Sequence, residues 1–281
     1  MASPDLVVVG HVVRDVTREG WRLGGTASFG AAQAQKLGLR VGVVTRVGPD
    51  LEMAGIMPKI EIAGRPAART TTFENTYEGA TRRQRVAAQA EPIEEQDIPD
   101  AWRDAPMALI GPVCREVSPE LPGVFANALV GIAAQGWLRE LDAEGHVRRS
   151  QWTGPPFWSS CRLLFVSDED VGDRPEQIDR WAADVPVTVV TRERRGARIH
   201  EHGRWRAIDA IPAREVDPTG AGDIFATAFM VRYHETGDAA QAARFASSAA
   251  AWSVEAPGID GVAGRAGIEA RMMEHPEVVL R

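Results

Sequence analysis

Cysteine is scarce in this sequence, and long apolar runs are missing. Cys114 and Cys161 are the two cysteines among 281 residues, too few for a disulfide framework or a cysteine-based zinc site. We predict that both are buried thiols of a cytoplasmic protein. No apolar run approaches the roughly 20 residues of a membrane-spanning helix. The chain enters a strand-like run at Leu6–Val9, so we expect neither a membrane anchor nor a signal peptide.

Positive charge is also in short supply. The 32 basic side chains are outnumbered by 39 acidic ones, and the formal net charge is −7 with a pI of about 5.5. Such a balance argues against general nucleic-acid binding, although it allows a local basic pocket for a nucleotide. A hydrophobic content of 44% and a charged content of 25% are typical of a globular enzyme. The length suits one domain over residues 1–281 with a small appendage.

Strand-like apolar runs alternate with helical patterns over most of the chain. The runs are apolar at consecutive positions, which is typical of strands buried on both faces of a parallel sheet. We expect strands at Leu6–Val9, Val41–Val47, Met107–Ile110, Leu129–Ala133, Leu163–Val166 and Val187–Val190. We expect helices at Ala27–Leu37, Pro175–Ala183, Ile224–Glu235 and Ala239–Val254. This alternation predicts an α/β sandwich with a mostly parallel sheet.

The most informative stretch runs from Asp217 to Phe225 and reads Asp-Pro-Thr-Gly-Ala-Gly-Asp-Ile-Phe. Gly220 and Gly222 allow the backbone unusual dihedral angles and a close approach to a ligand. A helix that begins there directs unpartnered N–H groups and its positive end at one point, a combination that binds phosphate. A carboxylate beside such a site repels a bound phosphate, so the presence of Asp223 there indicates that it takes part in the reaction. We predict that it accepts a proton from an alcohol attacking the phosphate; the alternative is a helix cap.

This string closely resembles the C-terminal signature of the ribokinase-like (PfkB) family of small-molecule kinases. The resemblance implies that Asp223 is the catalytic base, and that the backbone from Gly220 through Ala221 and Gly222 forms an anion hole with it. It also implies a three-layer α/β/α sandwich with a mostly parallel central sheet and a small β lid. ATP and Mg²⁺ are the cofactors it implies. A P-loop pattern is missing, which excludes a Walker-type kinase.

A second motif, Gly24-Gly25-Thr26-Ala27-Ser28-Phe29, opens the first expected helix. With Asp15 upstream, it resembles the N-terminal signature of the same family, in which an Asp holds substrate hydroxyls and a Gly-Gly pair approaches the substrate. A carboxylate can accept two hydroxyl hydrogen bonds, which suits a polyol. Asp15, Gly24 and Gly25 are therefore predicted to bind substrate. The alternative for Asp15 is a turn residue after the strand.

Phe29 departs from the pattern of many sugar kinases in the family, which have a sugar-contacting Asn at this place. A ring supplies packing or stacking instead of hydrogen bonds, so the sequence disfavours a ribokinase or fructokinase. With Gly10-His11 and Asp15 upstream, the local string looks more like the myo-inositol kinase branch. We predict that Phe29 and His11 line the substrate pocket, with a buried structural histidine as the alternative for His11.

The metal site also departs from the family, which usually organises Mg²⁺ through an Asn-x-x-Glu motif. The matching place reads Ser167-Asp168-Glu169-Asp170. Asp170 replaces the Glu in this interpretation, because Mg²⁺ prefers oxygen ligands and commonly keeps its waters. A solvated acidic loop is the alternative.

The nucleotide site is less sharply marked. Thr191 and Gly196 retain two positions of a Thr-x-Gly-x-x-Gly segment that lies near the ATP phosphates in the family. Thr219 belongs to the main motif, and Gly258 follows the helix that lines adenine in relatives. The resemblance therefore implies Thr191, Gly196, Thr219 and Gly258 as cofactor-binding residues.

One stretch, from Lys59 to about Gln89, breaks the α/β alternation. It is rich in Thr and Arg and alternates polar with apolar residues, which predicts strands around Ile60, Ile62, Thr70–Phe73, Tyr77 and Val86. Together with 14–23, the segment 59–89 is predicted to form a β lid that closes over the substrate and excludes water. A surface hairpin without function is the alternative.

These patterns predict an ATP-dependent phosphotransferase that acts on a hydroxyl of a small polyol or sugar, with myo-inositol as the first choice. The alternatives are a nucleoside or hexose kinase of the same family and a non-catalytic sugar or nucleotide sensor. The expected partner is a small molecule, with neither nucleic acid nor membrane. Lids in this family sometimes pair between subunits, which leaves a homodimer open.

Overall fold

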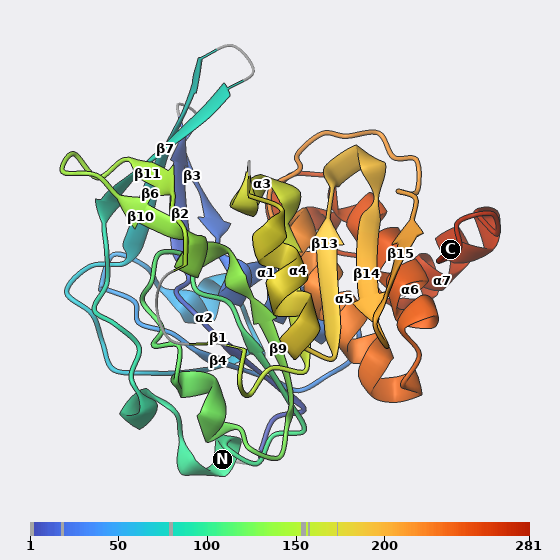
Figure 1. Cartoon of the computed structure of the whole chain (residues 1–281). Coiled ribbons are helices and arrows are strands. Elements are labelled where there is room, and N and C mark those ends of the chain that lie inside the picture. Colours follow the sequence, from blue (N-terminus) through green and yellow to red (C-terminus); the bar gives the residue numbers. More distant parts are fainter. Residues whose placement is uncertain (1–2, 18–19, 79–80, 153–155, 157, 173) are drawn as a thin grey trace.

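A nine-stranded sheet runs through the centre of the protein (Figure 1). The computed structural model describes residues 3–17, 20–78, 81–152, 156, 158–172 and 174–281. Adjacent strands from β13 to β5 run parallel, and β14 and β15 add an antiparallel edge. In order across the sheet, the strands are β15 (Arg204–Ile208), β14 (Ala197–Glu201), β13 (Val187–Thr191), β12 (Leu163–Ser167), β9 (Leu129–Ala133), β8 (Met107–Ile110), β1 (Leu6–Val9), β4 (Val41–Val44) and β5 (Glu61–Ala63).

The central strands are buried on both faces, which explains their unbroken apolar sequences. In β1, Leu6 and Val8 belong to one hydrophobic core, whereas Val7 and Val9 belong to another. Successive side chains of a strand point to opposite faces of the sheet, so the sheet separates the two cores. Other central strands, such as β12, divide their residues in the same way.

Helices cover the two faces unequally (Figure 1). The first core is covered by α1 (Thr26–Lys36), α5 (Ala221–Thr236), α6 (Ala239–Ser253) and α7 (Arg265–Glu274). The second is covered by α4 (Glu176–Asp184) and by 3-10 segments that include η2 (Asp100–Trp102), η3 (Leu121–Val124) and η4 (Ala134–Leu138). The remaining short segments are α2 (Met53–Ile56), α3 (Asp168–Val171), η1 (Glu95–Asp97), η5 (Glu193–Arg195) and η6 (Gly258–Gly261). The three layers form the predicted α/β/α sandwich.

All six predicted strands and all four predicted helices are confirmed, with ends displaced by up to three residues. The largest displacements are at β4, which ends at Val44, and at α5. Helix α5 begins at Ala221 because Gly220 adopts the left-handed conformation, with φ of 78°, and serves as the N-cap. The β14–β15 hairpin was not predicted, since its strands are only partly buried and carry several charged residues.

A second, small sheet of four strands lies beside the large one. Its strands, in order, are β3 (Gly20–Gly24), β2 (Val13–Thr17), β6 (Thr71–Glu78) and β7 (Thr81–Ala88). These strands lie within the predicted lid segments except at Val13 and Gly24, which extend the first segment by one residue at each end. Residues 18–19 and 79–80 of these segments lie outside the described part. The predicted start of the second lid segment at 59 is wrong, because Ile62 belongs to β5 and pairs with Val43 of the large sheet. Of the predicted segment 59–89, only β6 and β7 therefore belong to the small sheet.

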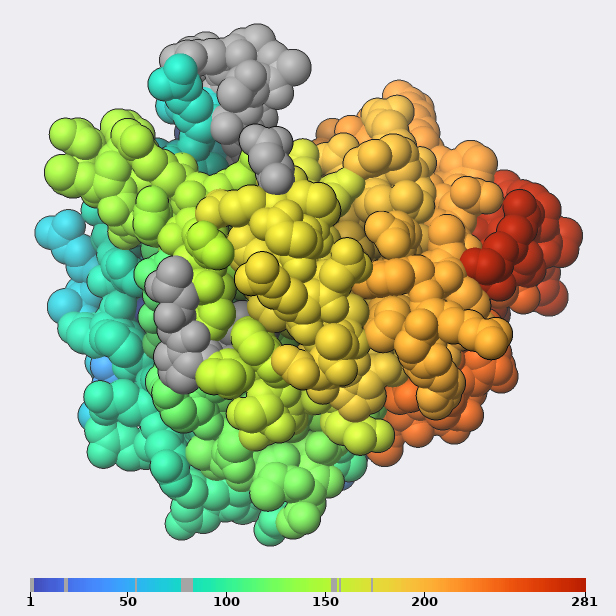
Figure 2. All heavy atoms as spheres, viewed as in Figure 1, coloured from blue at the N-terminus to red at the C-terminus, as the bar shows by residue number. Residues whose placement is uncertain are grey.

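A two-stranded hairpin, β10 (Arg139–Leu141) and β11 (Val147–Arg149), packs against β7. The backbone N–H of Val86 in β7 donates to the carbonyl of Gly145 in the hairpin turn at 2.9 Å. Figure 2 shows the hairpin surface in yellow-green, between the projecting end of the small sheet and the yellow surface that includes α4. The hairpin is thus bound to β7, an edge strand of the small sheet.

Both cysteines are free and buried, as predicted. Across the residues that are described, every helix is too short or too polar to cross a membrane.

Candidate active site

Several of the predicted site residues lie at the carboxyl ends of the parallel strands. In open α/β sheets, ligands bind outside this edge, between the loops that follow the strands. Asp170 follows β12, and Thr191 ends β13. The N-termini of α1 and α5 bring Thr26 and Asp223 together, and Thr26 Oγ1 donates a 2.6 Å hydrogen bond to Asp223 Oδ1. We call this region the carboxyl edge.

Asp223 lies in the first turn of α5, half-buried at the carboxyl edge. Burial raises the pKa of Asp223 to about 6, although the hydrogen bond from Thr26 and the positive charge of Arg139 lower it. The negative charges of Asp170 and Asp15 raise it further. A pKa near neutrality suits a general base, because the group is ionised at pH 7 and can still hold a proton.

The glycine turn before α5 is packed from below by an aromatic ring. A β-carbon added to Gly220 would lie 2.4 Å from the ring of Phe29, so only glycine fits there. Phe29 is 1% exposed, and the backbone of Gly220 packs against its ring. The structure therefore gives Phe29 a supporting role, and the predicted stacking on a substrate is not retained.

The amides of the same turn are not equivalent. The N–H of Ala221 donates to the carbonyl of Pro218 at 3.2 Å, which closes the turn. The N–H groups of Gly222 and Asp223 belong to the first turn of α5, where the helix itself supplies no acceptors. These two amides, with the positive end of the helix, are the better donors for an anion.

Asp15 lies on β2 of the small sheet and faces the glycine pair. A β-carbon on Gly24 would lie 2.0 Å from Asp15 Oδ2, so this glycine makes room for the carboxylate. Asn75 on β6 donates to Asp15 Oδ1 at 3.0 Å, and Gln84 on β7 donates to Asn75 Oδ1 at 3.0 Å. Asp15 therefore begins a polar chain that crosses the small sheet.

His11 and Gly25 lie beneath this region. His11 is fully buried, with Nδ1 2.8 Å from the Thr71 hydroxyl and Nε2 3.1 Å from the Glu91 carbonyl. Burial lowers the pKa of His11, so the ring is neutral. Gly25 has φ of 84° as N-cap of α1, and a β-carbon there would meet the His11 carbonyl oxygen at 2.5 Å. His11 is thus the buried structural histidine of the alternative interpretation.

Asp170 is the third residue of the short helix α3 and forms a capping box with Ser167 at its N-terminus. Its Oδ2 accepts the backbone N–H of Ser167 at 2.9 Å, and its Oδ1 accepts Gln135 Nε2 at 3.1 Å. Burial raises the pKa of Asp170, although the Ser167 N–H and the charge of Arg139 lower it. The carboxylate is therefore held in one orientation at the carboxyl edge.

The nucleotide-side residues divide into two groups. Thr191 ends β13, where its hydroxyl lies 3.4 Å from the Val166 carbonyl. Gly196 turns the chain into β14 with φ of 77°, and a β-carbon there would lie 2.0 Å from the Ile208 carbonyl oxygen. The glycine at this position is therefore required by the hairpin itself.

Asp217 organises the second group. Its Oδ1 accepts the N–H of Thr219 at 3.0 Å, and its Oδ2 accepts the N–H of Gly258 and the Arg22 guanidinium, both at 3.2 Å. Burial raises the pKa of Asp217, but the hydrogen bonds from Thr219 and Gly258 outweigh it and lower the pKa. This one carboxylate joins the turn before α5, the loop after α6 and strand β3.

Comparison with known proteins finds kinases that are similar to this chain. A model of the pfkB family carbohydrate kinases matches residues 163–262, which include the turn with Asp223. The cytidine kinase of Thermococcus kodakarensis is 27% identical over 253 residues, 82% of this chain and 88% of that protein. The inositol 3-kinase of Oryza sativa subsp. japonica is 28% identical over 279 residues, 90% of this chain and 70% of that protein. Over residues 163–262, the chain is similar to the pfkB family carbohydrate kinases.

Solved structures confirm the fold of this protein. A pyrophosphate-dependent kinase in the ribokinase family matches with a TM-score of 0.79 at 21% identity, over 94% of this chain and 99% of that one. The ribokinase of Arabidopsis thaliana, solved with ribose and ATP, matches with a TM-score of 0.73 at 20% identity, over 97% and 99%. The ribokinase-like fold predicted from the two motifs is correct.

Four residues of the kinase site were not predicted from the sequence. Thr26 and Asp217 lie inside the two recognised motifs, so their positions could have drawn attention to them. Asn75 and Gln84 lie in the Thr- and Arg-rich stretch, where only the pairing of β2 with β6 and of β6 with β7 brings them to Asp15.

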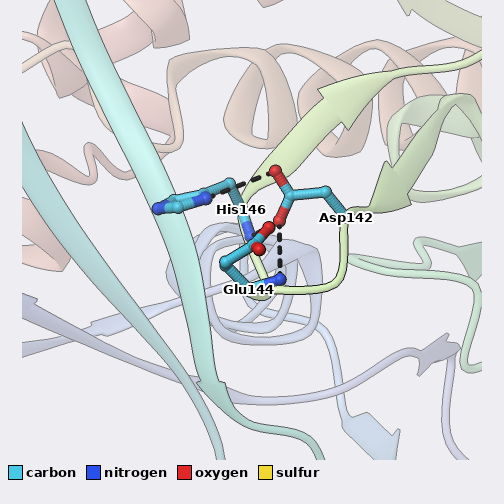
Figure 3. A group of neighbouring side chains, drawn as sticks. All are labelled: Asp142, Glu144 and His146. Carbon is cyan, nitrogen blue, oxygen red and sulfur yellow. Dashed lines mark hydrogen bonds and ion pairs between the residues drawn. The ribbon is translucent and has the colours of Figure 1, made fainter.

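A separate group of three neighbouring side chains, Asp142, Glu144 and His146, is of the kinds that bind metal ions in proteins (Figure 3). The Asp142 carboxylate accepts the backbone N–H groups of Glu144 and His146 at 3.1 and 2.8 Å and the Arg148 guanidinium at 2.8 Å. Partial burial raises the pKa of Asp142, but these hydrogen bonds outweigh it and hold the pKa at about 2. Asp142 therefore organises the turn between β10 and β11.

Proposed function

We propose that this protein transfers a phosphoryl group from ATP to a hydroxyl of a small polyol, with myo-inositol as the first choice. The observation that carries the proposal is the Asp223 carboxylate. It lies in the first turn of α5, its pKa is raised to about 6, and Thr26 orients it. An ionised carboxylate at a helix N-terminus is suited to accept a proton from an alcohol next to a bound phosphate.

The transfer uses residues from both sheets. Asp15 holds hydroxyls of the acceptor, beside Gly24, and directs one hydroxyl to Asp223. Asp223 takes the proton as the acceptor oxygen bonds to phosphorus and the bond to the leaving phosphate breaks. The amides of Gly222 and Asp223 stabilise the charge that develops, and Ala221 and Gly220 shape the turn. Positioning and electrostatics supply most of the rate in such reactions.

Asp170 fits a magnesium ion held through water. Its two oxygens each accept one hydrogen bond within the protein, from Ser167 and Gln135, and a carboxylate has lone pairs left for water. Mg²⁺ usually keeps several waters and binds one or two carboxylates together with substrate phosphates. When bound, the ion supplies positive charge that neutralises the donor phosphates. We assign Asp170 to this role.

The nucleotide is assigned to the other side of the carboxyl edge. We assign Thr191 and Thr219 to bind it, and the turns at Gly196 and Gly258 allow the backbone to pass close by. The ribokinase solved with ATP supports this donor. Pyrophosphate is the second candidate, because a solved kinase of the same fold is described as pyrophosphate-dependent.

The small sheet is assigned as the lid, made of β3, β2, β6 and β7. Its polar chain from Asp15 through Asn75 to Gln84 offers hydrogen-bonding groups, as an acceptor rich in hydroxyls requires. A closing lid excludes water and so protects the donor from hydrolysis.

Myo-inositol is preferred over a nucleoside for two reasons. The relative named inositol 3-kinase is aligned with 90% of this chain, and Asp15 and its polar neighbours suit a polyol. A nucleoside is the second candidate, because another relative is named cytidine kinase. Phe29 is 1% exposed, so its ring does not offer a stacking surface for a nucleobase.

The proposal is tested by product formation across a matrix of donors and acceptors. The donors are Mg-ATP and magnesium pyrophosphate, and the acceptors are myo-inositol, cytidine, ribose and fructose, with Asp223→Asn as control. Inositol phosphate formed from ATP by the wild type, and lost in the variant, is the expected result. Turnover of cytidine alone would replace the acceptor, and turnover with pyrophosphate alone would replace the donor. Binding of these ligands without any product would favour the sensor alternative.

A further inference from the structure

The loop that follows β8, residues 111–116, begins at the carboxyl edge, and we call it the β8 loop. Strands β1 and β8 pair in parallel, with Val9 beside Ile110, so the segments that follow the two strands begin side by side. A β-carbon on Gly10 would lie 2.2 Å from the Gly111 carbonyl oxygen. The β8 loop is therefore packed directly against the end of β1.

Glu116 is a buried acid of this loop that the proposed reaction does not use, and it is 1% exposed. Its Oε1 accepts the N–H of His11 at 3.1 Å and that of Val113 at 2.8 Å. Its Oε2 accepts the N–H of Cys114 at 2.7 Å. A carboxylate that loses its water on burial requires such donors. Glu116 therefore joins the end of β1 to the middle of the β8 loop.

The middle of the loop depends on this carboxylate. The ends of the loop are held by backbone hydrogen bonds, from the Gly111 N–H at one end and the Arg115 N–H at the other. Within the described part of the chain, Glu116 is the sole acceptor for the N–H groups of Val113 and Cys114. Loss of the carboxylate would leave these buried donors unpaired, which is costly, so the loop would shift to find other partners.

The β8 loop contacts the first residues of α1. A β-carbon on Gly111 would lie 2.3 Å from both the β-carbon and the methyl carbon of Thr26. A β-carbon on Gly25 would lie 3.3 Å from Cγ1 of Val113. Threonine divides between two side-chain rotamers in helices. Packing of the loop against the Thr26 methyl group favours the one whose hydroxyl reaches Asp223 at 2.6 Å.

We propose that Glu116 is a positioning residue, which fixes the β8 loop against Thr26 and so orients the Asp223 carboxylate that takes the acceptor proton. Glu116 acts through the backbone of Gly111 and the side chain of Thr26, since its own oxygens are bound to backbone N–H groups. The inference rests on the proposed function, in which Asp223 is the base.

The β8 loop also holds the far end of the polar chain that begins at Asp15. The carbonyl of Val113 accepts Nη1 of Arg139 at 3.2 Å, and Nη2 of Arg139 donates to Gln84 Oε1 at 3.4 Å. Gln84 is bound through Asn75 to Asp15. A displaced loop would therefore disturb the groups on the acceptor side as well as the base.

The first test compares Glu116→Gln with Glu120→Gln, once wild-type turnover is established. The new amide has one acceptor oxygen, and its NH₂ group would face backbone N–H groups, so the β8 loop should shift. Glu120 undergoes the same chemical change at the exposed surface, where it accepts the Ser118 hydroxyl. We expect Glu116→Gln to lower kcat by about 10- to 100-fold and to move the acid limb of kcat/KM to higher pH. Glu120→Gln should match the wild type in both.

A double-mutant cycle with Thr26→Val tests whether the effect passes through Thr26. Changes that act through one contact are not additive. In the Thr26→Val background, Glu116→Gln should leave the acid limb in place, because the hydrogen bond that it disturbs is already absent. A shift that persists there would come from Arg139, Asp170 or Asp15, the charged groups that act on Asp223, and would overturn the inference.

Carbon NMR of the Asp223 carboxyl group measures its pKa without turnover. The pKa should be about 6 in the wild type and higher in Glu116→Gln, since a hydrogen bond to the ionised form is weakened. Glu116→Asp keeps the charge but withdraws the carboxylate by one methylene group. It should give an intermediate pKa, and it replaces Glu116→Gln if that variant does not fold.

The outcomes separate the inference from the proposed function. A wild-type pKa of Asp223 in both Glu116 variants would overturn the inference and leave the proposed function intact. A wild type without any turnover would overturn the proposed function, and the pKa of Asp223 in the variants would then still decide whether Glu116 orients that carboxylate.

Discussion

Asp223 combines the proposed chemistry with a cost to stability. Its folded-state pKa of about 6 lies above the ordinary value of 3.8. Between these values the folded state binds more protons than the unfolded state, so the free energy of unfolding falls as pH rises from about 4 to 6. Above pH 6 the loss is complete. Ionised Asp223 therefore lowers the free energy of unfolding at neutral pH.

Asp223→Asn should separate these two effects. The amide cannot accept the alcohol proton, so we expect turnover to fall by at least about 100-fold. The same variant should be more stable than the wild type at pH 8, by about 1 to 3 kcal/mol, and equal to it near pH 4. Thermal unfolding at both pH values measures this, and a variant destabilised at pH 8 would contradict the raised pKa.

Thr26 should set the pH at which the base works. The activity of the wild type should decline as pH falls through about 6, the pKa of Asp223. The 2.6 Å hydrogen bond from Thr26 lowers the pKa of Asp223. Thr26→Val removes this bond and should raise the pKa, so the acid limb of kcat/KM should move to higher pH. Thr26→Ser keeps the hydroxyl and should leave the limb in place. An unshifted limb in the valine variant would mean that another group titrates.

At the scale of elements, the turn before α5 is held by contacts from two distant segments. Phe29 in α1 packs under Gly220, and Asp217 joins the turn to the Gly258 loop and to Arg22 of β3. A helix N-terminus binds an anion well only if its preceding turn is fixed. Elements that are remote in sequence therefore keep the proposed anion hole in shape.

Asp217→Asn tests this arrangement. The amide can still accept from Thr219, but its NH₂ group would face the N–H of Gly258 and the Arg22 guanidinium, which are also donors. We expect a loss of about 1 to 2 kcal/mol in the free energy of unfolding and a higher KM for the donor. Arg22→Gln removes the ion pair with Asp217, in which the guanidinium is 48% exposed. Exposed ion pairs contribute little, so the effect of Arg22→Gln should stay below about 0.5 kcal/mol. Equal effects of the two variants would show that the ion pair, and not the turn, carries the stability.

At the scale of the whole molecule, both thiols are buried in hydrophobic clusters. Cys161 lies in the second core of the large sheet, and Cys114 lies in a small third cluster with Val13, Phe73 and Val113. Burial raises the pKa of Cys114 to about 11 and raises that of Cys161 as well. A thiol reacts as its thiolate, so neither cysteine should react with a disulfide reagent at pH 8 while the protein is folded. In denaturant, two thiols per chain should react at once. One fast thiol in the native protein would show that a core opens readily.

The elements that are most buried were predicted best from the sequence. Strands such as β1 and β12 face a core on each side, so their sequences are apolar throughout and the strands were predicted correctly. The β14–β15 hairpin is partly exposed at the sheet edge and gave no such signal. Residues around β5 resemble the neighbouring lid sequence, and only their pairing with β4 assigns them to the large sheet.

The sequence by itself determined the order and type of the main elements, the ribokinase-like fold, and the placement of Asp223 at the start of a helix. These features depend on local periodicity and on short motifs, which neighbouring residues determine. The tertiary structure alone decided that Phe29 supports a glycine turn, and that Asp15, Asn75, Gln84 and Arg139 form one polar chain. The residues of that chain lie up to 124 positions apart. Only strand pairing and loop packing bring them together, because such contacts join segments that no local pattern connects.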